Sequence, residues 1–485
     1  MVLPSNPSTM TIARVLSTSK LCRSIPCSLS LFSTSTPQRQ QPSPSPKVAI
    51  IGGGIGGLAT ACALSHKRID NLTVYDKAAE FIPTAGAGFG FSPNGQVCLE
   101  SLGITAARHL LHPFNRIARL DKSGSCIVQE SEVLKQIRTR HGFGVAGCLR
   151  ADLVNVLLEK LQNDRSEDDM VKYSHRLTHI AQVADKVELV FENGHSDVVD
   201  MVVGADGIHS FVARSLDIDH SKPVYSGANI FYGVIDERNI EWTSPVLRNS
   251  NNLSNTVLQG PGTGEFIAFP VGPPSASKLI WATTYPSQEP PSSKDNEWDV
   301  LQTKNSDLLM HSILPQFPDT HPIHDLVAHT EQNRILHFGL YHRKHKTTWF
   351  RGNVVLLGDS CHATLPYVGQ GANQAIEDAI VLSDCLDSHL KSTPSSRMSS
   401  ASNEKYAQVF QEYYNRRFQR TKRVVTIANI MNTLYHSKNV FVQYFLDFIL
   451  SQVLSGGLMF KQIEKEIVEE CPVKDYGRYR HDKHI

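Results

Sequence analysis

No aspartate or glutamate precedes Asp70 in this chain. The stretch from Met1 to Lys47 is rich in serine and proline and carries scattered arginine and lysine, a composition typical of a mitochondrial transit peptide. It contains no apolar stretch long enough for a secretory signal. We therefore predict that residues 1–46 are disordered. They serve either as the transit peptide of a mitochondrial protein or as a plain tail of a cytoplasmic one.

Paired cysteines and a strong net charge are also missing. The nine cysteines form no C-x-x-C pair, and their odd number argues against a disulfide framework and a zinc site. The formal net charge of +1 gives no general attraction for nucleic acid. With 485 residues, 41% hydrophobic and 20% charged, the chain suits two or three globular domains. We expect a reducing compartment, no metal and no nucleic-acid partner; the oligomeric state is open.

No apolar run has both the length and the purity of a membrane span. The most apolar one, "NVFVQYFLDFILSQVLSGGLMF", is interrupted by Gln443, Asp447 and Gln452, and an ionisable group near mid-bilayer is costly. We predict a helix packed on the body of the protein and no transmembrane span. Peripheral membrane contact through this C-terminal helix is the less favoured alternative.

A second helical pattern, "YAQVFQEYYNRRFQRTKRVVTIANIMNTLYH", precedes that run and follows a polar loop. Several basic residues lie close together in it: Arg416, Arg417, Arg420, Lys422 and Arg423. We expect them to form a solvated face of the helix. Contact with a phosphate or a membrane surface is the alternative.

The first functional motif is "KVAIIGGGIGGL", an apolar strand followed by Gly52, Gly54 and Gly57 in G-x-G-x-x-G spacing. The first glycine permits a tight turn, the second lets a pyrophosphate approach the backbone, and the third lets a helix pack close to the strand. The N–H groups at the start of that helix face the anion. A second strand, "NLTVYD", ends at Asp76, where a carboxylate can accept from ribose hydroxyls. The combination predicts dinucleotide binding and leaves NAD, NADP and FAD open.

Two later segments repeat the pattern of an apolar strand followed by a turn that contains glycine and aspartate. "VDMVVGADGIHSFVARSL" is an apolar strand that ends in an Asp-Gly turn at Asp206, and "WFRGNVVLLGDS" ends in a Gly-Asp turn at Asp359. A simple dehydrogenase needs one glycine-rich turn, so three such elements indicate a longer ligand held at several points. Ordinary strand-to-helix turns are the alternative for each of the later two. Between them, "PVYSGANIFYGVI" and "KLIWATTYP" have the composition of an antiparallel sheet.

The motifs G-x-G-x-x-G, Asp-Gly and Gly-Asp, in this order and followed by "PYVGQGANQAIEDA", resemble those of the group A FAD-dependent aromatic monooxygenases. This is the family of salicylate and para-hydroxybenzoate hydroxylases and, more distantly, of zeaxanthin epoxidase-like enzymes. The likeness spans roughly Lys47 to Leu386. It implies an α/β fold, with an FAD/NAD(P)-binding Rossmann-type three-layer domain, an inserted, mainly antiparallel β-sheet substrate domain and a C-terminal helical tail. The expected boundaries are 47–110, 146–222 and 334–390 for the FAD-binding domain, 111–145 and 223–333 for the substrate domain, and 403–470 for the helical region.

The resemblance also implies which residues hold FAD. They are Gly52, Gly54, Gly57, Asp76, Gly88, Arg150, Asp206, Asp359, Gly371, Ala372 and Asn373. The early turn would take the ADP pyrophosphate, and the late one the ribityl chain and the isoalloxazine. Two positions depart from the family: glutamate is usual where Asp76 stands, and arginine is common where His209 stands. Arg214 is then the cation expected to remain near the Asp-Gly turn.

The activity implied by the resemblance is a monooxygenation. NAD(P)H would reduce FAD, O2 would add at flavin C4a, and the hydroperoxide would hydroxylate a small aromatic substrate. The substrate-side candidates are Tyr232, His209, Arg214 and His362, although a buried tyrosine or histidine is often structural. Epoxidation of a terpenoid alkene and a non-catalytic flavin-binding scaffold are the alternatives. A W-x-W-x-I-P motif typical of flavin-dependent halogenases is absent.

Overall fold

The computed structural model describes most of the chain beyond the N-terminal segment. The described residues are 45–81, 87–121, 124–130, 132–163, 170–215, 222–236, 240–244, 247, 255–259, 266–276, 278–291, 303–345, 348–392, 405–455 and 470–473. Residues 1–44 of the predicted transit peptide lie outside these residues.

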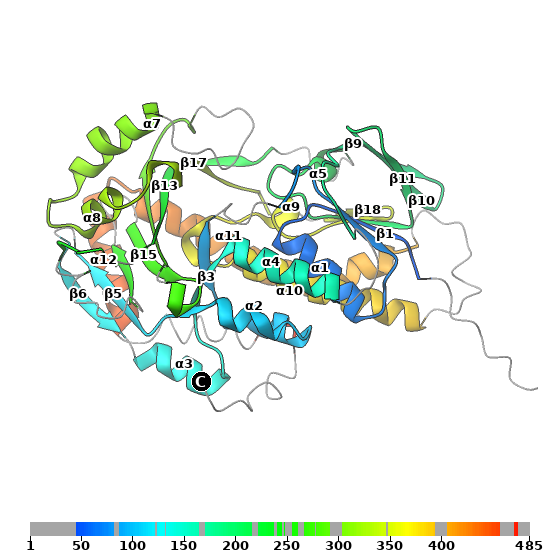
Figure 1. Ribbon diagram of the computed structural model, residues 1–485, viewed down its shortest axis with the longest axis horizontal. Coiled ribbons are helices and arrows are strands. Elements are labelled where there is room, and N and C mark those ends of the chain that lie inside the picture. The colour runs from blue at the N-terminus through cyan, green and yellow to red at the C-terminus, as the bar shows by residue number, and fades with distance from the viewer. Residues whose placement is uncertain are drawn as a thin grey trace, which may run out of the picture. The chain divides into compact units, whose positions relative to one another are not determined.

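A six-stranded sheet forms the centre of the nucleotide-binding part (Figure 1). In spatial order its strands are β18 (Phe350–Arg351), β19 (Val354–Leu356), β12 (Met201–Gly204), β1 (Val48–Ile51), β2 (Leu72–Tyr75) and β8 (Val171–Lys172). All neighbours pair in parallel except β18 and β19. The four residues of β1 are buried, as expected for a central parallel strand covered on both faces. The carboxyl ends of β1, β2, β12 and β19 therefore meet at one edge.

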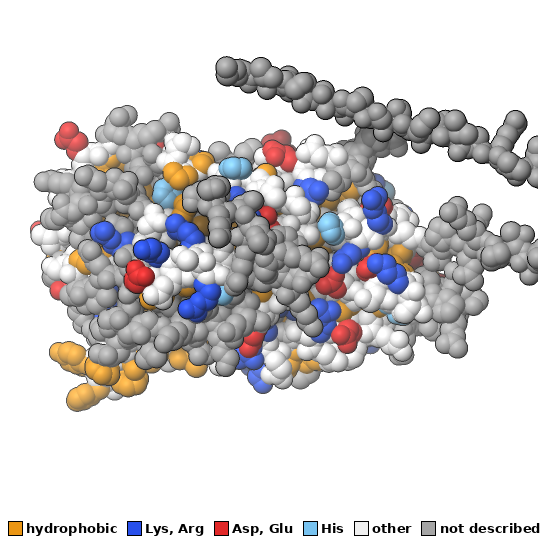
Figure 2. Space-filling model, turned by 90° about the horizontal axis from the view of Figure 1, so that it is seen from below, with side chains coloured by type: hydrophobic (Ala, Val, Ile, Leu, Met, Phe, Trp, Pro, Cys, Tyr) orange, Lys and Arg blue, Asp and Glu red, His pale blue; other side chains and the backbone are white. Residues whose placement is uncertain are grey.

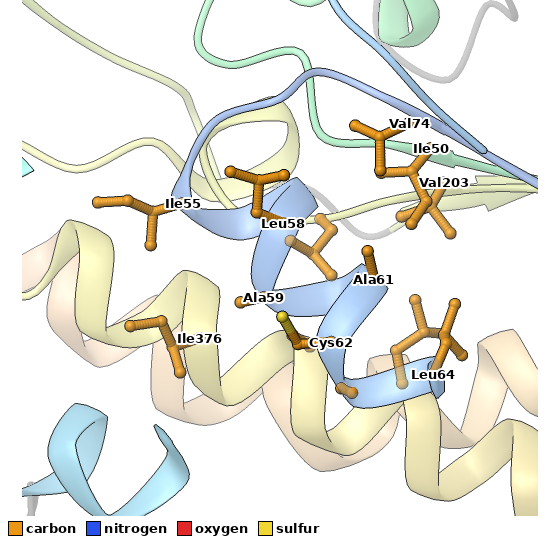
Figure 3. Close-up of a cluster of buried hydrophobic side chains, with 14 of the residues drawn as sticks. Ile50, Ile55, Leu58, Ala59, Ala61, Cys62, Leu64, Val74, Val203 and Ile376 are labelled. Carbon is orange, nitrogen blue, oxygen red and sulfur yellow. The ribbon is translucent and has the colours of Figure 1, made fainter. Parts of the chain in front are cut away.

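Helix α1 (Ile55–His66) packs on β1 and β2 of this sheet. Helices α4 (Arg150–Asn163) and α10 (Gly371–Ser392) pack on α1, and α2 (Pro93–Ser101) packs on α10. The small residues of α1, such as Ala59 and Ala61, let it pack closely between the sheet and α10. Figure 3 shows Leu58 of α1 near the sheet residues Ile50 and Val203, with Ile376 of α10 on the other side of the helix.

A β-meander forms a further layer beside β2 and β12. Its strands are β9 (Leu177–Val183), β10 (Lys186–Phe191) and β11 (Ser196–Val199). Tyr75 at the end of β2 stacks on Phe191 of the meander at a ring distance of 4.4 Å, and its hydroxyl donates to Asp197. Helices, parallel sheet and meander make up the three layers expected from the sequence.

The second large sheet has seven strands. In spatial order they are β17 (Ile335–His342), β13 (Val224–Asp236), β16 (Lys278–Pro286), β15 (Phe266–Val271), β14 (Asn255–Gln259), β5 (Arg116–Leu120) and β6 (Cys126–Glu130). All pairs are antiparallel except β14 with β5. Strands from the segments 111–145 and 223–333 thus share one sheet. Strand β17, which lies within the range expected for the FAD-binding domain, pairs with β13 and belongs to this sheet.

The two faces of the seven-stranded sheet have different neighbours. On one face Phe231 and Trp281 join a core with the short helix α8 (Pro322–Ala328). On the other face Tyr232 and Ile280 pack toward the loop at Leu365–Val368. A small sheet of β3 (Gly88–Phe91), β7 (Ala146–Leu149) and β4 (His112–Pro113) lies next to this second face, since β15 contacts β7.

Two helices form the C-terminal region. Helix α11 (Ala407–Tyr435) packs on α10, and α12 (Val440–Ser455) contacts α11 and β6. Hydrophobic side chains project into solvent at the end of the molecule where α12 lies (Figure 2). Within the described ranges, the helices are all too short or too polar to cross a bilayer.

Candidate functional site

The first glycine-rich turn is closed so tightly that side chains are excluded. Gly52 has a φ of +113°, and a Cβ atom there would lie 2.4 Å from the carbonyl oxygen of Ala205. A Cβ at Gly57 would lie 1.9 Å from the carbonyl oxygen of Gly52. Both positions need glycine, and the contact with Ala205 already joins the first turn to the Asp-Gly turn after β12.

Asp76 and Arg150 bring opposite charges to the first turn. The Asp76 carboxylate accepts the Gly53 N–H at 2.5 Å and the Ala78 N–H at 2.7 Å, so it lies at the carboxyl ends of β1 and β2. Arg150 begins α4, and its guanidinium Nη2 is 3.4 Å from where a Cβ at Gly54 would stand. A cation beside exposed N–H groups at a helix N-terminus suits a pyrophosphate.

Asp206 has a structural role that the sequence did not indicate. Its carboxylate accepts from Ser210 Oγ at 2.5 Å and from the N–H groups of Phe211 and Val212 at 2.6 and 3.1 Å, which caps the short helix α5 (Phe211–Ser215). Burial raises the pKa of the Asp206 carboxyl, and these hydrogen bonds oppose that rise. The predicted contact of Asp206 with FAD stays a prediction.

Arg214 and His209 lie on the exposed side of the same turn. The Arg214 guanidinium donates to the backbone carbonyl of His209 at 2.5 Å, and both side chains are exposed. A different cation is buried at this turn: Arg343, fully shielded from solvent, donates from Nε and Nη2 to the carbonyl of Ile208. Arg343 follows β17, and no motif in the sequence pointed to it.

The Gly358–Asp359 turn completes a cluster of three turns. Ser360 Oγ donates to the carbonyl of Gly204 at 2.6 Å, and the Leu357 N–H donates to the same oxygen at 3.0 Å. The late turn is thereby joined to the Asp-Gly turn, which is joined to the first turn through Gly52. Asp359 starts the short helix α9 (Asp359–His362), and its side chain is exposed. The predicted convergence of three distant segments is present.

The N-terminus of α10 is the next element of the site. The N–H groups of Gly371, Ala372 and Asn373 belong to the first helical turn, which has no intrahelical acceptors for them. The Asn373 side chain is fully buried and binds the chain itself: it donates to the carbonyls of Gly369 and Gly90 and accepts the Ser92 N–H at 3.1 Å. It therefore fixes β3 and the start of α2 beside the helix N-terminus.

Tyr232 links the large sheet to β3. Its hydroxyl oxygen accepts the backbone N–H of Gly88, and its side chain is almost completely buried. Burial raises the pKa of the Tyr232 phenol well above its usual range, so the group stays protonated. The roles predicted for Tyr232, Arg214 and His209 in catalysis stay predictions.

An apolar surface faces the loop before α10. The sheet contributes Ile230, Tyr232, Phe269, Val271, Ile280 and Ala282, and the loop contributes Leu365, Tyr367 and Val368. The Tyr367 hydroxyl donates to Asn432 Oδ1 at 2.8 Å and lies 3.0 Å from His436 Nε2, both near the end of α11. Asn432 Nδ2 in turn donates to the carbonyl of Ser226 on β13 at 3.1 Å.

His362 and two of the α11 arginines belong to a buried charge cluster. His362 Nε2 is 2.6 Å from Asp378 Oδ2. Arg417 and Arg420 are buried and pair with Glu377 and Asp378 of α10, so our prediction of a solvated face was wrong for these two residues. Burial lowers the pKa of His362, but Asp378 and Cys361 together outweigh burial and hold that pKa well above the usual range.

Comparison with known proteins agrees with this geometry. The sequence model of a family described as "FAD binding domain" matches residues 45–415. The 3-amino-4-hydroxybenzoate 2-monooxygenase PtnB3 of Streptomyces platensis is 30% identical over 348 residues, which are 70% of this chain and 79% of that protein. The chain belongs to the group A FAD-dependent monooxygenases.

Two further proteins are similar to this monooxygenase in sequence or in fold. Salicylate hydroxylase of Pseudomonas putida is 27% identical over 354 residues, covering 71% of this chain and 77% of that one. Klebsiella pneumoniae HpxO, solved with FAD and uric acid, shares the fold with a TM-score of 0.69 at 24% identity, covering 87% of this chain and 96% of that one. The monooxygenase is an oxidoreductase with FAD as cofactor and NAD(P)H as co-substrate.

The residues of the site fit FAD. The space that glycine leaves at the first turn, the cation of Arg150 and the N–H groups at the start of α10 provide contacts for the anionic and polar parts of a long dinucleotide. When bound, FAD supplies hydride acceptance from NAD(P)H and the activation of O2. The monooxygenase chain contributes binding and orientation through the three turns. The apolar sheet face opposite the loop before α10 offers a lining of the kind that excludes water.

Proposed function

We propose that this FAD-dependent monooxygenase hydroxylates a small aromatic ring that already carries a hydroxyl group. The apolar face of the sheet, opposite the loop at Leu365–Val368, carries the proposal, because it is lined by aliphatic and aromatic side chains that suit a planar ring. The names of the relatives support it: they act on 3-amino-4-hydroxybenzoate, salicylate and 6-methylsalicylate. A hydroxyl group makes the ring electron-rich, which favours attack by an electrophilic oxygen.

The test is a substrate panel with the holoenzyme. Hydroxybenzoates, neutral phenols and terpenoid alkenes are compared by the rate of NAD(P)H oxidation and by product mass. We expect a hydroxylated aromatic to accelerate NAD(P)H oxidation and to yield a product with one added oxygen on the ring. An epoxide from an alkene, or stimulation by no compound of the panel, would contradict the proposal.

We further propose that α12 contacts a membrane surface peripherally. Phe441, Tyr444, Phe445 and Phe448 are 84, 71, 60 and 61% exposed, and their spacing places them on one face of the helix. Aromatic side chains are favoured at the interface between lipid and water, and an amphipathic helix binds there with its apolar face. An exposed apolar cluster of this kind is otherwise unfavourable in water.

Vesicle sedimentation tests the contact. The full chain is mixed with phosphatidylcholine vesicles containing anionic phosphatidylserine and compared with the double variant Phe441→Glu, Phe445→Glu. A matched control is Val183→Glu, which changes a similarly exposed apolar residue of β9. We expect only the double variant to lose vesicle binding. A wild-type chain that ignores vesicles, or that buries α12 in a dimer by size-exclusion analysis, would overturn the contact.

For the location in the cell we propose mitochondrial targeting through residues 1–46. The support is compositional: arginine, lysine and serine without any acidic residue. A fluorescent protein fused behind these residues should enter mitochondria, and replacing Arg14 and Arg23 by glutamate should keep it outside. A fusion that stays in the cytoplasm would favour the plain-tail alternative.

A further inference from the structure

Asp378 lies behind the late turn of the cofactor site. This carboxylate is completely buried on α10 and accepts three hydrogen bonds: from the Gly358 N–H at 3.0 Å, from His362 Nε2 at 2.6 Å and from Arg417 Nε at 2.6 Å. Gly358 precedes Asp359, and His362 is the last residue of α9. One carboxylate therefore holds the residue before Asp359 and the far end of the same short helix.

Glu377, the neighbour of Asp378, connects the same charge cluster to the residues at the N-terminus of α10. It is also completely buried, and it accepts from Arg417 Nη1 at 2.5 Å, from Arg420 at 2.6 and 2.7 Å and from Asn94 Nδ2 at 2.6 Å. Asn94 lies in the first turn of α2 and also donates to Gln370 Oε1 at 3.2 Å. Gln370 immediately precedes the N-terminus of α10, so this branch reaches the second backbone segment that faces FAD.

Arg417 joins the two branches. Its guanidinium binds Asp378 through Nε, Glu377 through Nη1, and the Gln374 side chain and carbonyl through Nη2. Two adjacent buried carboxylates would repel each other without cations, and a carboxylate left unpaired in the interior is strongly unfavourable. A planar guanidinium with donors on two edges can bridge both, whereas a lysine ammonium cannot span the same geometry.

We propose that Arg417 is a positioning residue for FAD, which sets the Gly358–Asp359 turn through Asp378 and the N-terminus of α10 through Glu377, Asn94 and Gln370. Helix α11 is then part of the cofactor site, although Arg417 lies beyond the residues 45–415 that match the family's sequence model. The inference rests on the assignment of FAD as the cofactor.

The experiment compares FAD retention in full-length variants. Arg417→Met removes the guanidinium that binds both Glu377 and Asp378. Arg417→Lys keeps the positive charge but cannot donate to both carboxylates at once. His362→Asn removes one hydrogen-bond donor to Asp378. Arg416→Met is the matched control, because Arg416 is the exposed neighbour on the same helix. For each holoenzyme, the FAD dissociation constant is measured from the fluorescence of released flavin, together with the melting temperature and the reduction potential of bound FAD.

We expect Arg417→Met to weaken FAD binding by at least about tenfold, with partial recovery in Arg417→Lys, as the loss of charged hydrogen bonds to the turn implies. The reduction potential should shift in both Arg417 variants, and Arg416→Met should behave as wild type. If Arg417→Met does not fold, Arg417→Lys and His362→Asn decide the question.

Two results would overturn the proposal. One is FAD affinity within about twofold of wild type in both Arg417→Lys and His362→Asn, a difference too small to reflect a lost charged contact. The other is a lower melting temperature with unchanged affinity and potential, which would show a structural role only. A wild-type chain that binds no FAD would instead contradict the cofactor assignment itself, so the two failures are distinguishable.

Discussion

The hydroxyl of Tyr232, on the substrate sheet, accepts the backbone N–H of Gly88, on the strand that leads toward the flavin-binding helix α2. The contact links this sheet to β3, beside the contacts between β15 and β7. The Tyr232 side chain is buried and Gly88 is half-buried, so the ring shields the bond from water.

Replacement of Tyr232 by phenylalanine should therefore destabilise the protein. A fully buried N–H without an acceptor costs about 1–3 kcal/mol, so for the half-buried Gly88 N–H we expect a loss near the lower end of that range, measured by denaturant titration of the holoenzyme. Because burial holds the pKa of Tyr232 far above the working pH, the pH profile of kcat/KM should be the same in Tyr232→Phe and wild type. A displaced limb in that profile would mean that Tyr232 exchanges a proton during catalysis.

Asp76 is expected to determine FAD affinity through the first turn. Alanine at this position removes the acceptor of the Gly53 N–H and the carboxylate predicted to bind ribose. We expect FAD to bind about tenfold or more weakly in Asp76→Ala, by about 1.4 kcal/mol or more. Asp76→Glu, which introduces the residue usual in the family, should restore most of the affinity. Equal affinity in wild type and Asp76→Ala would place the ribose elsewhere.

The His362–Asp378 pair predicts a stability change on the alkaline side. The pKa of His362 is raised in the folded protein above its ordinary value of 6.5, because Asp378 and Cys361 together outweigh the lowering effect of burial. The folded state therefore binds the proton more tightly than the unfolded state. This stabilisation is complete below pH 6.5 and is lost as the pH rises through the raised folded-state pKa.

Denaturant titrations from about pH 6 to about pH 10 measure this loss as a falling free energy of unfolding. The slope should be smaller in His362→Asn, which has no proton to lose, and unchanged in the control His109→Asn, an exposed histidine. If the free energy of unfolding falls as steeply with rising pH in His362→Asn as in wild type, groups other than His362 cause the loss.

Cys98 and Cys471 are expected to form a disulfide under mild oxidation. Their sulfur atoms are 3.9 Å apart, both side chains are buried, and a bond requires an approach to about 2.05 Å. Burial and the neighbouring Cys471 raise the pKa of Cys98, so the reaction should be slow. Peptide mapping after diamide treatment should recover the 98–471 cross-link, and the melting temperature should rise, since such links stabilise by about 2–4 kcal/mol.

Cys98→Ser and Cys471→Ser should each abolish the cross-link, while Cys126→Ser, at an exposed position, should leave it intact. Cross-links that join Cys126 to either partner in place of this pair would show that the tail does not dock as the structure has it.

The three turns could be predicted from the sequence because each depends on local signals. A buried strand of four apolar residues and a glycine where no side chain fits are visible within one short segment, as at Val48–Ile51 and Gly52. Their convergence could be inferred as well, since carboxyl ends of parallel strands meet at one edge. The antiparallel sheet was predictable from short runs of β-branched and aromatic residues for the same local reason.

The partners of the buried charged residues could not be predicted from the sequence. Arg417 and Arg420 look solvated in the sequence because their acidic partners, Glu377 and Asp378, come from another helix. Arg343 adds a second, buried cation at the Asp-Gly turn where Arg214 was expected, and only tertiary packing brings it there. The links that Asn373 makes to Gly90 and Ser92 likewise depend on geometry between distant segments.

Asn432 has a consequence for the evolution of specificity in this chain. Its side-chain amide accepts the Tyr367 hydroxyl from the loop before α10 and donates to the Ser226 carbonyl on β13. If the substrate binds between this loop and the sheet, as we propose, the last turns of α11 set the spacing of the two walls and with it the size of ring that can enter. Selection acting on that helix end could alter which molecules are admitted while every contact to the nucleotide stays as it is.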